Sequence, residues 1–248
     1  MNARKKKVIV DTDMGWDDWL AILFLMQHPD VELIGLTVTG VGEAHLTPGV
    51  QNARNLLELG GKGTVPVCAG TSLPLIYSNV FPPDFRQKID NIFNLDLPVN
   101  PHPIDPRSAV TFLQETLSSC PDKVTILSIG GMTNLGTMIR ESAHKFDDKI
   151  ERIFIMGGAI DVKGNVAGFQ EYFYDPLAAA VMAGTANLVT KTEMKKLKVV
   201  QELNEEDDYS GQLIDDSFAN SVEVCMSIDS HVFQDVFKNI LNQESNPL

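Results

Sequence analysis

The segment VIVDTDMGWDD, residues 8–18, contains the strongest indication of the fold in this sequence. Val8–Asp11 is apolar and β-branched and predicts a buried strand, whereas the pattern from Asp17 to His28 is helical. Gly15 allows the chain to turn sharply between the two. The stretch therefore predicts a strand that leads directly into a helix, which is the opening unit of an α/β fold.

The same alternation continues along the chain. Further strands are expected at 31–39, 65–68, 124–129, 153–156, 197–202 and 222–227, and further helices at 47–59, 109–117, 135–144, from 176 onward and at 231–241. The proline-rich stretch 82–103 is expected to be irregular, and the acidic run 205–208 to be a solvated turn. Apolar strands separated by helices indicate an open, mostly parallel, Rossmann-like sheet with helices on both faces. We expect a single domain over 1–248.

The composition limits the possible partners and compartment. A net charge of -13 argues against nucleic acid and anionic membranes as partners. The three cysteines form no CxxC pattern, which argues against a disulfide framework or a zinc site. The longest apolar run, Trp19–Met26, is too short to span a membrane, and the apolar run after the basic N-terminus is too short for a signal peptide. We therefore expect a cytoplasmic protein.

Four aspartates crowd the end of the first strand: Asp11, Asp13, Asp17 and Asp18. The carboxyl ends of parallel strands are where open α/β sheets bind ligands. Helix capping accounts for one or two of these aspartates, but four would repel one another unless a cation or shared protons offset the charge. Ligation by carboxylates alone favours Ca²⁺ or Mg²⁺ over zinc.

Two later segments could complete such a site. The glycines after Ser128 allow close approach of the backbone, so a main-chain carbonyl near Ile129 could bind a metal. Asp175 precedes a helix that has Pro176 at its first position, and taken alone it is better interpreted as a helix cap.

Taken together, these motifs resemble the inosine–uridine-preferring nucleoside hydrolase family over nearly the whole chain. The matching segments are DTDMGWDD at 11–18, TGVGE at 39–43, ILSIGGMTN at 126–134, MGGA at 156–159 with Gly164-Asn165, and YDPLAAA at 174–180. The resemblance implies Ca²⁺-dependent hydrolysis of the N-glycosidic bond of ribonucleosides, which gives ribose and a free base. It also implies a role in purine or pyrimidine salvage and a homodimer or homotetramer.

The resemblance further implies a role for individual residues. Calcium would be held by Asp13, Asp18, Asp175 and the carbonyl of Ile129, with Asp13 also the general base for the metal-bound water. Residues implied to bind the substrate are Asp17, Glu43, Asn165, Glu171 and Tyr174. Asp11 would orient its neighbouring carboxylates from behind.

The chain departs from the family pattern at several positions. Met14 replaces a proline, and Glu43 replaces a sugar-binding asparagine. Tyr174 stands where some members have a histidine that protonates the leaving base, and tyrosine is the weaker acid. Phe173 follows Tyr172 directly, where the family continues with a ribose-binding asparagine and several dozen further residues. We therefore expect a segment near 172–173 to be shortened.

Two alternative functions stay open on the sequence. Asp11-x-Asp13 after a first strand also fits a haloacid-dehalogenase-type phosphatase, in which Asp11 would be the nucleophile. The shortened segment and Tyr174 would also fit a calcium-dependent nucleoside-binding homologue with little turnover.

Overall fold

The computed structural model describes residues 4–75, 81–160, 174–199 and 212–242. These residues form two compact units. The first contains the described residues of 1–156, 173–184 and 237–248, and the second contains those of 157–172 and 185–236. The expectation of one domain over 1–248, shortened near 172–173, stays a prediction.

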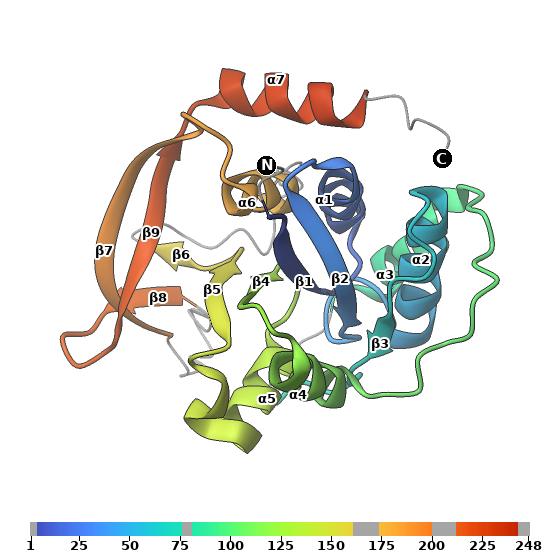
Figure 1. Ribbon diagram of the computed structural model, residues 1–248, viewed down its shortest axis with the longest axis horizontal. Coiled ribbons are helices and arrows are strands. Elements are labelled where there is room, and N and C mark those ends of the chain that lie inside the picture. The colour runs from blue at the N-terminus through green and yellow to red at the C-terminus, as the bar shows by residue number, and fades with distance from the viewer. Residues whose placement is uncertain (1–3, 76–80, 161–173, 200–211, 243–248) are drawn as a thin grey trace. The chain divides into compact units, whose positions relative to one another are not determined.

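The first unit is built on a five-stranded sheet in the order β3-β2-β1-β4-β5 (Figure 1). Its strands are β1 (Lys6–Thr12), β2 (Val31–Val38), β3 (Val67–Ala69), β4 (Val124–Ser128) and β5 (Ile150–Ile155). Every neighbouring pair is parallel. β1 lies at the centre, and its carboxyl end therefore has a strand on either side. The predicted parallel sheet is confirmed.

Helices cover both faces of this sheet (Figure 1). They are α1 (Trp16–Gln27), α2 (Leu46–Leu59), α4 (Ala109–Ser119), α5 (Thr133–Ser142) with the 3₁₀ turn η2 (Ala143–Phe146), and α6 (Tyr174–Ala183). Ile9 and Ile126, which are partners in the β1–β4 register, pack into one core cluster with Phe112 of α4 and Leu135 of α5. α1 and α6 pack together on the opposite face. Alternate strand residues thus bury both faces of the sheet.

One helix was not predicted. The proline-rich stretch that we expected to be irregular contains α3 (Pro83–Asp90), followed by the 3₁₀ turn η1 (Ile92–Asn94). Pro83 lies in the first turn, where its missing N–H costs nothing, and Asp84 and Lys88 complement the helix dipole at the two ends. The prolines of this stretch led to the prediction of an irregular segment, and the short helix was therefore missed.

The second unit contains a four-stranded sheet in the order β6-β8-β7-β9. Its strands are β6 (Ala159–Ile160), β7 (Val189–Val199), β8 (Gln212–Asp215) and β9 (Ser221–Ile228). β7 pairs antiparallel with both β8 and β9. β6 and β8 were not predicted, and β7 begins at Val189 instead of Leu197, because its sequence VTKTEMKKLKV is rich in lysine and lacks an apolar run. Residues 200–202 of that predicted strand and the acidic run 205–208 lie outside the described residues.

The closing helix α7 (Ser230–Leu241) agrees with the prediction. Its Phe237 stacks on Phe24 of α1, with the ring centroids 5.8 Å apart, so both aromatic rings contribute to the first unit. No described helix is long and apolar enough to cross a membrane.

Candidate functional site

The acidic site is assembled by the starts of two helices. Asp17 and Asp18 lie in the first turn of α1, which follows β1 after a three-residue turn, and Asp175 lies in the first turn of α6. The amino end of a helix carries a partial positive charge, so both helix ends stabilise carboxylates placed there. This arrangement explains how three negative side chains can be held together inside the first unit.

These three carboxylates are close together and buried. Asp17, Asp18 and Asp175 each offer an oxygen atom, and the three atoms lie within 4.8 Å of one another. Their exposed fractions are 8%, 2% and 1%. Asp18 and Asp175 were predicted to be metal ligands, and the structure brings them together. It places Asp17, predicted to bind ribose hydroxyls, in the same group.

Asp13 lies beside this group and is held by the loop that follows β2. Its Oδ2 accepts a hydrogen bond from the main-chain N–H of Glu43 at 2.9 Å, and its carbonyl accepts one from Ala44 at 3.2 Å. Gly42 packs so closely here that a methyl group in its place would overlap Asp13 Oδ2. The negative charge of Asp13 raises the pKa of both Asp18 and Asp175.

The turn between β1 and α1 is fixed by hydrogen bonds to its neighbours. The Thr12 hydroxyl donates to Asp18 Oδ1 and accepts from the Met14 N–H at 2.9 Å. Trp19 Nε1 donates to the Met14 carbonyl at 3.0 Å. Met14 is fully buried with φ at 59°, a conformation that is closed to proline because its ring fixes φ near -65°. A proline at position 14 could therefore not adopt the backbone conformation that Met14 has in this turn.

Burial dominates the electrostatics of the site. It raises the pKa of Asp13, against the effect of the Glu43 N–H, which lowers it. It raises the pKa of Asp18 and Asp175 well above the usual range, and the neighbouring negative charges add to this effect. Without a cation, these side chains therefore retain protons that exposed aspartates would lose.

Asp11 lies behind the acidic group and connects three elements. It is completely buried, and its Oδ1 accepts hydrogen bonds from the Thr37 hydroxyl at 2.7 Å and the Asn134 amide at 2.9 Å. Burial raises its pKa to about 6, although both hydrogen bonds act in the opposite direction. Its carbonyl accepts from the N–H of Ile129 at 2.9 Å, which fixes the segment after β4 against the end of β1.

Of the other predicted site residues, one lies beside the acidic group, two lie at the ends of neighbouring elements, and two are not described. Glu43 shares the space beside Gly15 with Asp18, since a methyl group on Gly15 would meet both carboxylates. Ile129 is buried directly after β4, and Tyr174 is 44% exposed at the start of α6. Asn165 and Glu171 lie outside the described residues.

Sequence reasoning missed the residues that support the carboxylates from neighbouring elements. Thr12, Thr37 and Asn134 were given no role in the site, although Thr12 and Asn134 lie within motifs that carry the family resemblance. A signal was available for Thr37, because Asp11 and Thr37 are register partners in the parallel pair β1–β2. No comparable signal exists for Asn134, whose contact with Asp11 depends on how α5 packs.

The donor set fits a hard divalent cation. The group offers carboxylate oxygens, and Asp175 Oδ1 is buried without a hydrogen-bond partner among the described residues. A buried, unsatisfied carboxylate oxygen is costly unless a cation or a proton compensates it. Oxygen ligands of this kind suit Ca²⁺ or Mg²⁺.

A parallel α/β sheet with an oxygen-rich candidate metal site at the carboxyl end of its central strand defines the class of the protein. The model of the family described as "Inosine-uridine preferring nucleoside hydrolase" matches residues 8–241, and the chain belongs to this family. The resemblance noted in the sequence is thereby confirmed.

Relatives of known name support the same assignment. Uridine nucleosidase 1 of Arabidopsis thaliana is 36% identical over 181 residues, a match that covers 72% of this chain and 53% of that protein. Inosine-uridine preferring nucleoside hydrolase of Leishmania major is 30% identical over 195 residues, covering 71% of this chain and 56% of that one. The chain thus spans about half the length of the curated relatives it matches.

Solved structures confirm the fold. A plant nucleoside hydrolase superposes with a TM-score of 0.82 at 19% sequence identity. The match covers 96% of this chain and 99% of the plant enzyme's chain. Purine-Preferring Ribonucleoside Hydrolase from Gardnerella vaginalis gives a TM-score of 0.80 at 22% identity, covering 95% and 98% of the two chains. The predicted open, mostly parallel α/β fold is therefore that of the nucleoside hydrolases.

The raised pKa values predict how stability depends on pH and calcium. A carboxyl whose pKa is raised by folding stabilises the fold below its unfolded pKa, and this contribution is lost as the pH rises through the folded pKa. The metal-free chain should therefore lose stability from about pH 4 through the value of about 6 for Asp11 and beyond. A divalent cation bound at this site would replace the protons, so its stabilising effect should grow over the same range.

Thermal unfolding of metal-stripped protein at pH 5 and pH 7.5, with and without Ca²⁺, measures this effect. At the higher pH we expect saturating calcium to raise Tm by roughly 5–10 °C, and by clearly less at pH 5. Sodium chloride of equal ionic strength is the control. A calcium effect that is equal at both pH values would contradict the account.

Proposed function

We propose that the chain is a Ca²⁺-dependent nucleoside hydrolase that cleaves the N-glycosidic bond of ribonucleosides into ribose and free base. The observation that carries the proposal is the buried group Asp17, Asp18 and Asp175, beside Asp13, in a chain of this family. The printed activities of the relatives, uridine nucleosidase and inosine-uridine preferring nucleoside hydrolase, support nucleosides as the substrate class.

Asp13, Asp18, Asp175 and the carbonyl of Ile129 would hold the calcium. The burial of all three carboxylates and the unsatisfied Asp175 Oδ1 support this set, and Asp17, which belongs to the same group, would lie next to the ion. Bound calcium would orient the ribose diol and make a water molecule more acidic.

Asp13 would accept the proton from the attacking water. The Glu43 N–H fixes the rotation of its carboxylate, and burial raises its pKa, which makes it a stronger base than an exposed aspartate. Asp11 would hold the end of β1 in place through its bonds to Thr37 and Asn134. The base is thus carried on the central strand of the sheet and not on a free loop.

Asp17, Glu43, Asn165, Glu171 and Tyr174 would contact the ribonucleoside. As the base departs, positive charge develops on the sugar, and a buried acidic pocket stabilises that charge. Asp17 and Glu43 provide this field among the described residues, since both lie with Asp18 around Gly15 and the start of α1.

The geometry weakens the phosphatase alternative. A nucleophilic Asp11 would have to meet a phosphate, but it is completely buried and bonded to Thr37 and Asn134. The alternative of a nucleoside-binding homologue with little turnover is separated from hydrolysis by the variants below. By family resemblance we further propose a cytoplasmic homodimer or homotetramer that acts in purine or pyrimidine salvage.

Two substitutions should separate metal binding from chemistry. Asp18→Ala removes a buried ligand and should abolish calcium binding and hydrolysis together. Asp13→Asn keeps the shape of the side chain but cannot accept a proton, so we expect kcat for uridine to fall about 10²–10⁴-fold while nucleoside binding persists. Calorimetry for binding and a reducing-sugar assay for turnover measure both.

Asp147→Ala is the matched control, because Asp147 is an aspartate whose side chain is 70% exposed. It should behave like the parent chain in both assays. Parent-level turnover by Asp13→Asn would show that another residue is the base. A parent chain that binds uridine without releasing uracil would favour the binding homologue.

The effect of replacing Tyr174 on the rate of hydrolysis should depend on the leaving group of the substrate. If the position serves the departing base, Tyr174→His should increase inosine hydrolysis by about 10-fold or more, because histidine is the better acid near neutral pH. p-Nitrophenyl riboside, whose leaving group needs no proton, should change little. Steady-state rates on the two substrates decide this, and an equal change on both would exclude a role in protonation.

A further inference from the structure

Arg86 is a buried arginine that lies outside the acidic group but is connected to it through the backbone. It belongs to α3, is 8% exposed, and its Nη2 donates to the carbonyls of Gly40 and Ala44, each at 2.7 Å. One nitrogen atom therefore joins the two ends of the loop 40–44. A guanidinium suits this task because its donors are planar and its charge is permanent.

The same loop holds Asp13. Glu43 donates its N–H to Asp13 Oδ2, and Ala44 donates its N–H to the Asp13 carbonyl. Ala44 is thus bonded on both sides, with its N–H on Asp13 and its carbonyl on Arg86. Since Gly42 already packs against Asp13 without room for a methyl group, a shift of this loop must move the carboxylate or lose its hydrogen bond.

α3 is anchored to the loop at a second point, through Asp90. Asp90 Oδ1 accepts the N–H of His45 at 2.8 Å, and its Oδ2 lies 2.6 Å from His45 Nδ1. The carbonyl of Asp90 accepts from the Asn52 amide of α2 at 2.9 Å. α3 is therefore held in place by these hydrogen bonds, and Arg86 holds the loop 40–44 against it.

We infer that Arg86 is a positioning residue for Asp13, acting through the loop 40–44. Only the expected effect of Arg86 on catalysis rests on the proposed function. Its effect on the orientation of Asp13 does not. Partners of this kind, one step removed from a metal ligand, typically change metal affinity or activity by about 10–100-fold when they are removed.

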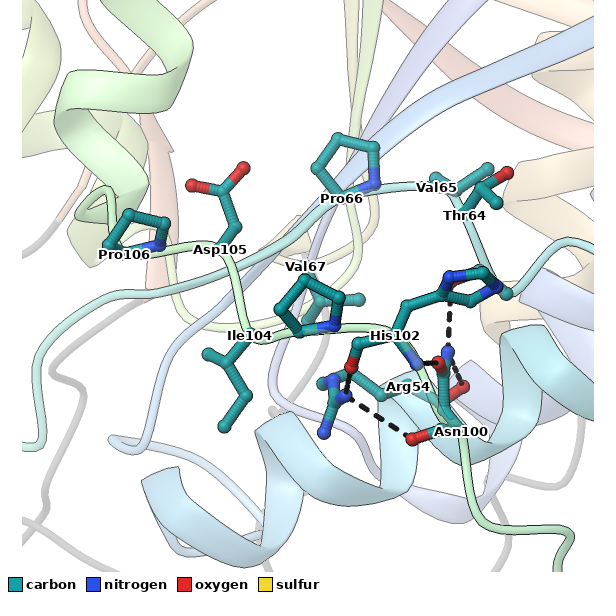
Figure 2. A pocket seen from close by; sticks show the side chains of 12 residues that line it. Arg54, Thr64, Val65, Pro66, Val67, Asn100, His102, Ile104, Asp105 and Pro106 are labelled. Carbon is teal, nitrogen blue, oxygen red and sulfur yellow. Dashed lines mark hydrogen bonds between the residues drawn. The ribbon is translucent and has the colours of Figure 1, made fainter.

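A second buried arginine provides a matched control. Arg54 of α2 is also 8% exposed and also donates to main-chain carbonyls, those of Asn100 and His102, beside a pocket of about 340 Å³ (Figure 2). Asn100 in turn donates to the carbonyls of Arg54 and Gly63, each at 3.0 Å. The loop that contains Asn100 and His102 precedes α4 and lies beside the residues just before β3. Arg54 therefore supports a loop at the amino end of a strand, whereas Asp13 lies at the carboxyl end of β1.

The experiment compares Arg86→Met and Arg86→Lys with Arg54→Met and Arg54→Lys in the full chain. Three quantities are measured: calcium affinity by calorimetry, kcat and KM for uridine, and hydrogen exchange of the peptide containing residues 40–45. The lysine variants keep the charge, and so remain informative if a methionine variant fails to fold.

In both Arg86 variants we expect calcium affinity and kcat to fall by about 10–100-fold, KM to change less, and exchange at 40–45 to accelerate. The Arg54 variants should lose thermal stability but keep all three quantities near the parent values. Equal effects of the two arginines, or unchanged exchange at 40–45 in Arg86→Met, would overturn the inference. If the parent chain hydrolyses no nucleoside, the proposed function fails, whereas exchange and calcium affinity still decide the role of Arg86.

Discussion

The structure depends on the burial of several carboxylates at the carboxyl end of one central strand. Asp17, Asp18 and Asp175 lie within 4.8 Å of one another, with Asp13 beside them. Without compensation, such a group would destabilise the fold, because desolvation and mutual repulsion both disfavour the charged forms. The surrounding structure supplies part of the compensation: two helix amino ends, the Thr12 hydroxyl and the Glu43 N–H.

The part of this cost that the protein does not compensate connects the fold to the proposed chemistry. Asp175 Oδ1 keeps no hydrogen-bond partner among the described residues, and burial raises the pKa of Asp13, Asp18 and Asp175. A buried cluster of carboxylates is suited to bind a cation and to stabilise a positively charged sugar. The same constraint would therefore serve both metal binding and glycosidic-bond cleavage.

Much of this arrangement could be predicted from the sequence because its signals are local. The strand, the glycine turn and the helix at 8–28 are contiguous, and the alternation of apolar strands with helices predicted the parallel sheet. α3 was missed because prolines surround it, and β7 because its lysines conceal the strand pattern. Asp18 and Asp175 were assigned to one site through the family resemblance, and the structure brings them together.

Most of the support of the site could not be predicted, because it depends on contacts between distant segments. Asn134 reaches Asp11 from α5, and Arg86 reaches the Asp13 loop from a helix that the sequence did not reveal. Such contacts follow from packing and leave no motif. The roles of Asn165 and Glu171, which lie outside the described residues, stay predictions.

Calcium titration of the metal-stripped chain at pH 7, repeated in buffers of different ionisation enthalpy, measures whether metal binding displaces protons from the buried carboxylates. We expect one calcium ion per chain, bound with net release of protons, because the ion would displace protons that burial retains on Asp18 and Asp175. Absence of binding, or binding without proton release, would contradict it.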